Sequence, residues 1–116
     1  MSAPALTAQQ QSLIVSVFRN HPEVVAAKLF GSRAKGTHTA QSDIDIALWG
    51  DIDALRAESI AAELDELPIP CSFDVKPFAL IKLQALREHI ERVGIVIFPH
   101  EPLQTAATTK AASSSR

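Results

Sequence analysis

Two aspartates one residue apart, Asp43 and Asp45, alternate with Ile44 and Ile46 in the stretch SDIDIALW. In a strand, both carboxylates would lie on one face and both isoleucines on the other, against the core. Two carboxylates this close repel each other, and one has a raised pKa unless a cation is present. Mg²⁺ prefers one or two carboxylates together with phosphate oxygens and water. The pair therefore indicates magnesium-dependent phosphate chemistry, although the same spacing also occurs at exposed strand ends.

A third carboxylate, Asp74, lies in the alternating stretch CSFDVKPF. Its apolar neighbours Phe73 and Val75 predict a strand, and burying an unpaired charge there would be costly. If this strand lies beside the Asp43–Asp45 strand, three carboxylates could hold two Mg²⁺ ions and the phosphates between them. The alternative is that Asp74 simply faces solvent.

A glycine-bounded turn, GSRAKG at 31–36, comes before the aspartate pair. Gly31 permits a tight backbone, and a helical turn beginning at Ser32 would direct N–H groups towards an anion. The Ser32 hydroxyl adds a donor, and Arg33 or Lys35 can neutralise phosphate. A Walker-type P-loop is excluded because Thr and His follow Gly36 in place of Lys and Ser/Thr. An ordinary connection between strands is the alternative.

The elements that must position these groups follow from hydrophobic periodicity and turn signals. Helices are predicted over 7–20, 51–67 and 80–94, and strands over 24–30, 43–49, 71–78 and 95–98. Thr7 and Gln10 have capping-box spacing, and Asp51 is the predicted cap of the second helix.

The inward-facing stripes of these helices can be read from the same periodicity. They are predicted to be Leu13, Ile14, Val17 and Phe18; Ile52, Leu55, Ile60 and Leu64; and Leu83, Leu86, Ile90 and Val93. The short link from Phe30 to Asp43 favours antiparallel strands, and the helix after Asp51 favours a parallel crossover. We therefore expect an α/β (α+β) fold, with a mixed sheet of three to four strands and helices on one side.

The composition is that of one globular domain of 116 residues with 47% hydrophobic residues. We expect a lead-in at 1–7, a domain at 8–98 and a disordered tail at 99–116. A net charge of −2 argues against direct binding to nucleic acid. With one cysteine, no leader and no apolar stretch of about 18 residues, the expected location is the cytoplasm, away from membranes.

The stretches LFGSRAKG, SDIDIAL and FDV together resemble the minimal nucleotidyltransferases of the DNA polymerase β-like superfamily. The resemblance covers about residues 8–98 and implies that superfamily's fold. It implies two Mg²⁺ ions held by the triad Asp43, Asp45 and Asp74. It also implies nucleotide binding by Gly31, Ser32, Arg33 and Ser42, with Arg33 supporting either the turn or the phosphates. Lys35 stands where the family commonly has arginine.

The reaction implied by the resemblance is attack of an acceptor hydroxyl on the α-phosphorus of ATP, with release of pyrophosphate. Asp74 would activate the acceptor. Members this small resemble the MNT antitoxins encoded beside HEPN ribonuclease toxins, which implies a toxin partner, a hetero-oligomer and adenylylation of that toxin. The chain has no Tyr of its own, which is consistent with an external acceptor.

Three other functions stay open on the sequence. The chain could be a non-catalytic antitoxin that acts by binding. It could be the catalytic subunit of an aminoglycoside-type nucleotidyltransferase. It could also be a plain structural domain.

Overall fold

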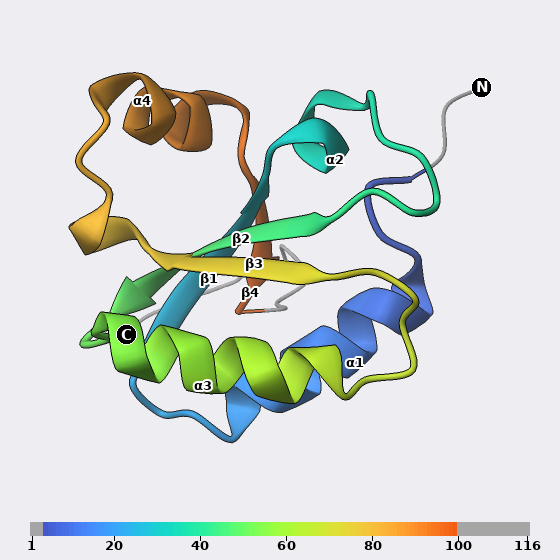
Figure 1. Cartoon of the computed structure of the whole chain (residues 1–116), viewed down its shortest axis with the longest axis horizontal. Coiled ribbons are helices and arrows are strands. Elements are labelled where there is room, and N and C mark those ends of the chain that lie inside the picture. The colour runs from blue at the N-terminus through green and yellow to red at the C-terminus, as the bar shows by residue number, and fades with distance from the viewer. Residues whose placement is uncertain (1–3, 100–116) are drawn as a thin grey trace, which may run out of the picture.

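The computed structural model describes residues 4–99 as one sheet with helices against it (Figure 1). The elements are α1 (Ala8–Arg19), β1 (Val24–Phe30), α2 (Ser32–Lys35), β2 (Ile44–Gly50), α3 (Ala54–Asp65), β3 (Phe73–Pro77), the 3₁₀ turn η1 (Phe78–Leu80), α4 (Gln84–Val93) and β4 (Ile95–Phe98). All but three residues of the predicted lead-in, and only Pro99 of the predicted tail, fall within the described residues; residues 100–116 lie outside them.

The sheet has four strands in the order β3-β2-β1-β4. β1 pairs antiparallel with β2 and with β4, and β2 pairs parallel with β3. The parallel pair is joined through α3, because a parallel connection needs a crossover. The predicted mixed α/β sheet is therefore confirmed, with the aspartate strand β2 in its interior.

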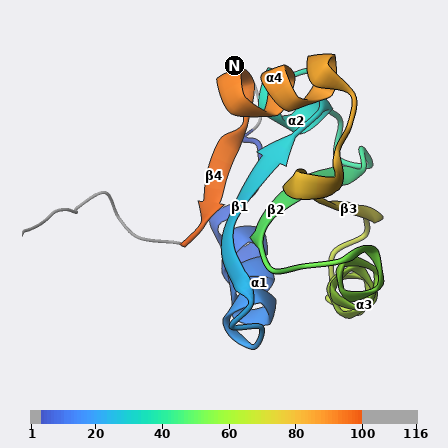
Figure 2. The same cartoon turned by 90° about the vertical axis from the view of Figure 1, so that its left-hand side faces the viewer.

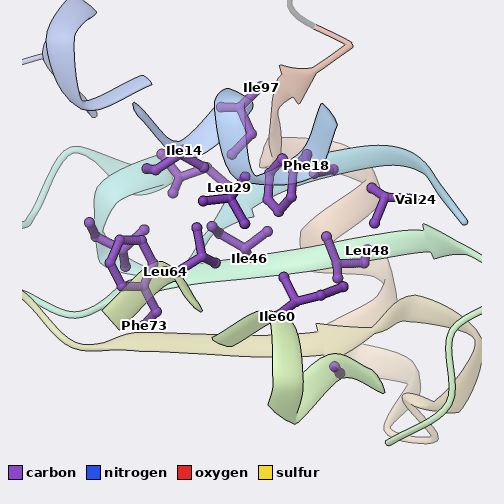
Figure 3. Close-up of a cluster of buried hydrophobic side chains, with 14 of the residues drawn as sticks. Ile14, Phe18, Val24, Leu29, Ile46, Leu48, Ile60, Leu64, Phe73 and Ile97 are labelled. Atoms are coloured by element: carbon purple, nitrogen blue, oxygen red, sulfur yellow. The ribbon is translucent and has the colours of Figure 1, made fainter. Parts of the chain in front are cut away.

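One face of the sheet packs against α1 and α3 (Figure 1). Ile46 and Leu48 of β2 and Leu29 of β1 meet Ile14 and Phe18 of α1 in a cluster of fully buried side chains (Figure 3). The capping box predicted at Thr7 and Gln10 is present at the start of α1. This cluster is the main hydrophobic core.

The opposite face packs against α4 and η1 (Figure 2). Phe30 and Ala47 of the sheet form a second cluster there with Phe78, Ile81 and Ile90. The expectation of helices on one side therefore applies to α1 and α3 but is wrong for α4. An apolar stripe shows that a helix is amphipathic, but it does not show which face of a sheet the helix covers.

Three details of the helices differ from the predictions. The cap of α3 is Asp53, whose side chain accepts a hydrogen bond from the Arg56 N–H at 2.8 Å, so Asp51 lies outside the helix. Leu55 is 75% exposed, because the buried stripe runs through Ala57, Ile60 and Leu64. Leu83 is 66% exposed, because α4 begins only at Gln84, after the 3₁₀ turn, and Val93, the last residue of α4, is 37% exposed.

Candidate active site

Asp45 and Asp74 lie directly opposite each other on neighbouring strands. The parallel register of β2 and β3 pairs Asp45 with Asp74, and the antiparallel register of β1 and β2 pairs Phe30 with Asp45. Paired residues of adjacent strands share a face of the sheet. Both carboxylates therefore lie on the face that carries Phe30 and α4, away from the main core.

Asp45 is the electrostatically unusual member of this group. Partial burial, followed by the negative charges of Asp74 and Asp43, raises the pKa of the Asp45 carboxyl above its ordinary value. Lys76 and Arg33 act in the opposite direction but do not cancel the effect. A cation beside Asp45 would relieve this repulsion.

The chemistry of the three aspartates fits a hard divalent cation, because all their donor atoms are carboxylate oxygens. Asp43 lies just before β2 and is exposed. Lys76 Nζ lies 3.5 Å from Asp74 Oδ1, so an ammonium group already neutralises part of this charge. Within residues 4–99, no three His, Cys, Asp or Glu side chains form a preassembled metal site. The donor set fits Mg²⁺, and its ligands would have to close around the ion.

Gly31 follows the end of β1 and lies against the Asp45 carboxylate. Its backbone has φ 75° and ψ −151°, a region that is essentially confined to glycine. A Cβ atom at Gly31 would overlap Asp45 Oδ2. The turn therefore passes directly over the Asp45 carboxylate, and Ser32 begins α2 immediately beside it. The glycine turn and Asp45, both predicted from the sequence as parts of one site, come together here.

Arg33 points into the protein and is only 5% exposed. Its guanidinium donates to the Ser42 carbonyl from Nε at 3.3 Å and from Nη2 at 3.0 Å, and to the Ala5 carbonyl from Nη1 at 3.0 Å. Nη2 also lies within 3.5 Å of the Thr39 and Ala40 carbonyls. Of the two roles expected for Arg33, support of the turn or of the phosphates, this arrangement fits the first, because the guanidinium ties the loop before β2 to α2.

Ser42 belongs to the same loop. Its hydroxyl accepts a hydrogen bond from the Thr39 N–H at 2.8 Å, and its carbonyl receives the Arg33 guanidinium. In the described structure Ser42 therefore shapes the entry to β2. Lys35, in contrast, is exposed at the end of α2, two residues beyond Arg33.

Two residues of this site were not predicted from the sequence. Lys76 pairs with Asp74, and the i, i+2 spacing on one strand is a signal that could have revealed it. His89 Nε2 accepts a hydrogen bond from the Gly31 N–H at 3.2 Å. Because 58 residues separate the two, no local pattern could have indicated this contact.

The family model described as "Polymerase beta, Nucleotidyltransferase" matches residues 12–102, which is most of the chain. The chain belongs to this nucleotidyltransferase family. The matched segment contains the Gly31 turn and all three aspartates. Family membership confirms the resemblance read from the sequence. Among curated proteins, none matches the sequence significantly.

Similar solved structures include several toxin–antitoxin complexes. A toxin–antitoxin with AMP-PNP has a TM-score of 0.64 at 22% identity, covering 76% of this chain and 72% of that one. The toxin–antitoxin complex MntA–HepT has a TM-score of 0.62 at 17% identity, covering 79% of this chain and 72% of that one. A complex of tri-AMPylated Shewanella oneidensis HEPN toxin with MNT antitoxin has a TM-score of 0.61 at 20% identity, covering 78% of this chain and 70% of that one. These likenesses show a shared fold.

No helix within residues 4–99 combines the length and the apolar composition needed to cross a membrane.

Proposed function

We propose that this nucleotidyltransferase moves AMP from ATP to a hydroxyl group of a partner protein, and that the partner is a HEPN-type toxin which it thereby neutralises. The observation that carries the proposal is the direct pairing of Asp45 with Asp74 beneath the Gly31 turn. Carboxylates for a divalent cation and a turn for phosphate then meet on one face of the sheet. The named toxin partners of the similar structures support the choice of acceptor class.

Asp45, Asp43 and Asp74 are the proposed metal ligands, holding two Mg²⁺ ions with ATP as substrate. When bound, Mg²⁺ would neutralise the phosphates and lower the pKa of the acceptor hydroxyl. Asp45 is the central ligand, because its carboxylate lies between Asp74 and the glycine turn. The raised pKa of Asp45 supports this role, since partial burial and the charges of Asp74 and Asp43 disfavour its carboxylate, and a bound cation would relieve that cost.

Gly31 and Ser32 form the proposed phosphate contact, and Lys35 supplies the positive charge. Gly31 lets the backbone approach closely, and the Ser32 N–H and hydroxyl are donors at the start of α2. Arg33 and Ser42, which were expected among the nucleotide-binding residues, hold the loop that leads to Asp43. Their proposed role is to keep β2 in register with the turn.

Asp74 is the proposed group that receives the proton of the acceptor hydroxyl. It lies on β3, at the edge of the described sheet, and its side chain is 50% exposed. A hydroxyl on another protein can therefore approach it without rearrangement of the core. General-base catalysis of this kind typically contributes a factor of about 10²–10⁴.

The test is the intact mass of a co-purified HEPN-type partner after incubation with ATP, Mg²⁺ and this chain. We expect the partner to gain the mass of one or more AMP units, and we expect an Asp45→Asn variant to transfer roughly a thousandfold more slowly. Asp51→Asn is the matched control, because Asp51 is exposed and lies outside the site. An unchanged partner mass with the wild-type chain would overturn the proposal.

The same experiment separates the other functions that the sequence left open. Full neutralisation of the toxin by Asp45→Asn would identify a non-catalytic antitoxin that acts by occlusion. Transfer of AMP to an aminoglycoside, with none to protein, would identify a small-molecule nucleotidyltransferase. Absence of any Mg²⁺-dependent ATP binding in calorimetry would leave a structural domain.

A further inference from the structure

We propose that His89 is a positioning residue that fixes the glycine turn over Asp45. Its Nε2 atom accepts the Gly31 N–H at 3.2 Å, which requires an unprotonated Nε2 and places the ring proton on Nδ1. The effect of His89 on nucleotide binding rests on the function proposed above. The hydrogen bond itself can be tested without reference to that function.

Gly31 needs such a partner because it lies beyond the ends of both strand ladders. The pairing of β1 with β2 ends at Phe30, and the pairing of β1 with β4 ends at Leu29, opposite Ile95. A backbone N–H that is half-buried and unpaired costs stability. The chain before β4 is α4, which contacts β1 and brings His89 to the Gly31 N–H.

His89 is held on a helix that is itself firmly anchored. The next residue, Ile90, is fully buried in the second cluster. Arg87 Nη1 donates to the Phe78 carbonyl at 3.0 Å and to the Ile81 carbonyl at 2.9 Å, and its guanidinium lies 4.2 Å from the Phe78 ring centroid. The His89 ring also packs edge-on against Phe30, with centroids 6.4 Å apart.

Through these contacts α4 joins the two halves of the site. Arg87 hydrogen-bonds to Phe78 in η1, which directly follows β3, and His89 hydrogen-bonds to the Gly31 turn that lies over Asp45. The turn has little freedom to move towards Asp45, because even a methyl group at Gly31 would overlap Asp45 Oδ2. His89 thus sets the position of the phosphate turn relative to the carboxylates, and Gly31's N–H is engaged within the protein.

The experiment compares His89→Leu, which removes the acceptor, with His89→Gln, whose side-chain oxygen restores one. Arg92→Leu, an exposed position on the same helix, is the matched control. By amide hydrogen exchange, we expect the Gly31 N–H to exchange roughly tenfold faster in His89→Leu, the factor implied by losing one hydrogen bond. Protection should return in His89→Gln and be unchanged in Arg92→Leu.

The second readout is the dissociation constant for a non-hydrolysable ATP analogue with Mg²⁺. We expect this dissociation constant to rise roughly tenfold in His89→Leu and to return towards the wild-type value in His89→Gln. Equal Gly31 exchange in the wild type and His89→Leu would overturn the proposal, as would equal analogue affinity in a wild type that binds. If the wild type itself does not bind the analogue, the proposed function fails, while amide exchange still decides the role of His89.

Discussion

The two faces of the sheet differ in what they cover. The face against α1 and α3 holds the main core, in which Ile46, Ile60 and Leu64 are fully buried among apolar neighbours. The face under α4 holds a smaller cluster and, beyond it, Asp45, Asp74 and the Gly31 turn. Alternation along β2 divides the two sets: even-numbered residues face the core and Asp45 faces the site.

This division teaches that one surface of β2 serves packing alone, while the other combines a smaller apolar cluster with the acidic groups of the candidate site. Apolar burial at about 25 cal/mol per Å² stabilises the fold from one side. The other side can then carry carboxylates whose mutual repulsion opposes folding. Variants on the core face should therefore affect stability alone, whereas variants on the site face can affect nucleotide binding as well.

The largest expected effect is that of Gly31→Ala. The new Cβ meets Asp45 Oδ2 at a position with φ 75°, so the turn must move away from the acidic pair. We expect AMP transfer to the partner to fall roughly a hundredfold or more, as a misplacement of about 1 Å can cause. Gly36→Ala is the control, because it has φ 79° but open space around it. That variant should lose only about 1–2 kcal/mol of stability in urea unfolding; equal loss of transfer in both would contradict the comparison.

The next largest expected effect is a loss of stability in Arg33→Lys. Lysine keeps the charge but cannot reproduce the fork of donors that holds the Ser42 and Ala5 carbonyls. We expect a loss of about 2 kcal/mol in the free energy of unfolding, measured in urea.

Lys35→Gln should have the opposite pattern to Arg33→Lys, with little effect on stability and a larger effect on nucleotide binding. Because Lys35 is exposed, the free energy of unfolding should stay within about 0.5 kcal/mol of the wild type. Affinity for the ATP analogue should fall roughly tenfold, with the loss of one charge-assisted hydrogen bond. A stability loss in Lys35→Gln as large as in Arg33→Lys would reject this division between a structural and a ligand-facing cation.

A matched pair of core variants, Ile60→Val and Ile90→Val, sharpens the comparison between faces. Both side chains are fully buried, so each variant should lose about 1 kcal/mol and several degrees in the melting temperature. Only Ile90→Val should also weaken binding of the ATP analogue, because Ile90 anchors the helix that carries His89. Equal analogue affinity in the two variants would show that α4 does not position the site.

The smallest effect is the pH dependence contributed by Asp45. Its folded-state pKa is raised, so the folded protein holds this proton to higher pH than the unfolded chain does. The associated stability is present below the ordinary pKa of 3.8 and is lost as pH rises through the folded value. Between about pH 4 and about pH 7, urea unfolding should show Asp45→Asn gaining stability relative to the wild type. A difference in unfolding free energy between Asp45→Asn and the wild type that does not change with pH would contradict a raised pKa of Asp45.

Much of the fold followed from short-range pattern. The strand 24–30 was predicted at its observed bounds, and the alternation around Asp45 placed its side chain away from the core. Phe30 and Asp43 are separated by a short link, which was sufficient to predict the antiparallel pair. These features depend on neighbours within a dozen residues, where sequence carries most of the information.

The features that the sequence left open or missed depend on distant partners. Arg33 was expected to support either the turn or the phosphates, and its burial depends on the carbonyls of Ala5 and Ser42 and the sulfur of Cys71. His89 reads as one more polar residue of a helix, because its contact with Gly31 arises only when α4 folds onto the second face. Charge type and helical period do not encode either arrangement.

The outer position of β3 in the described sheet has a consequence for the proposed transfer reaction. A group arriving at the outer edge of the described sheet can reach the Asp74 carboxylate on the face that also carries Asp45. We therefore expect selectivity for the acceptor to depend on how well the shape of the partner protein fits this edge of the described sheet.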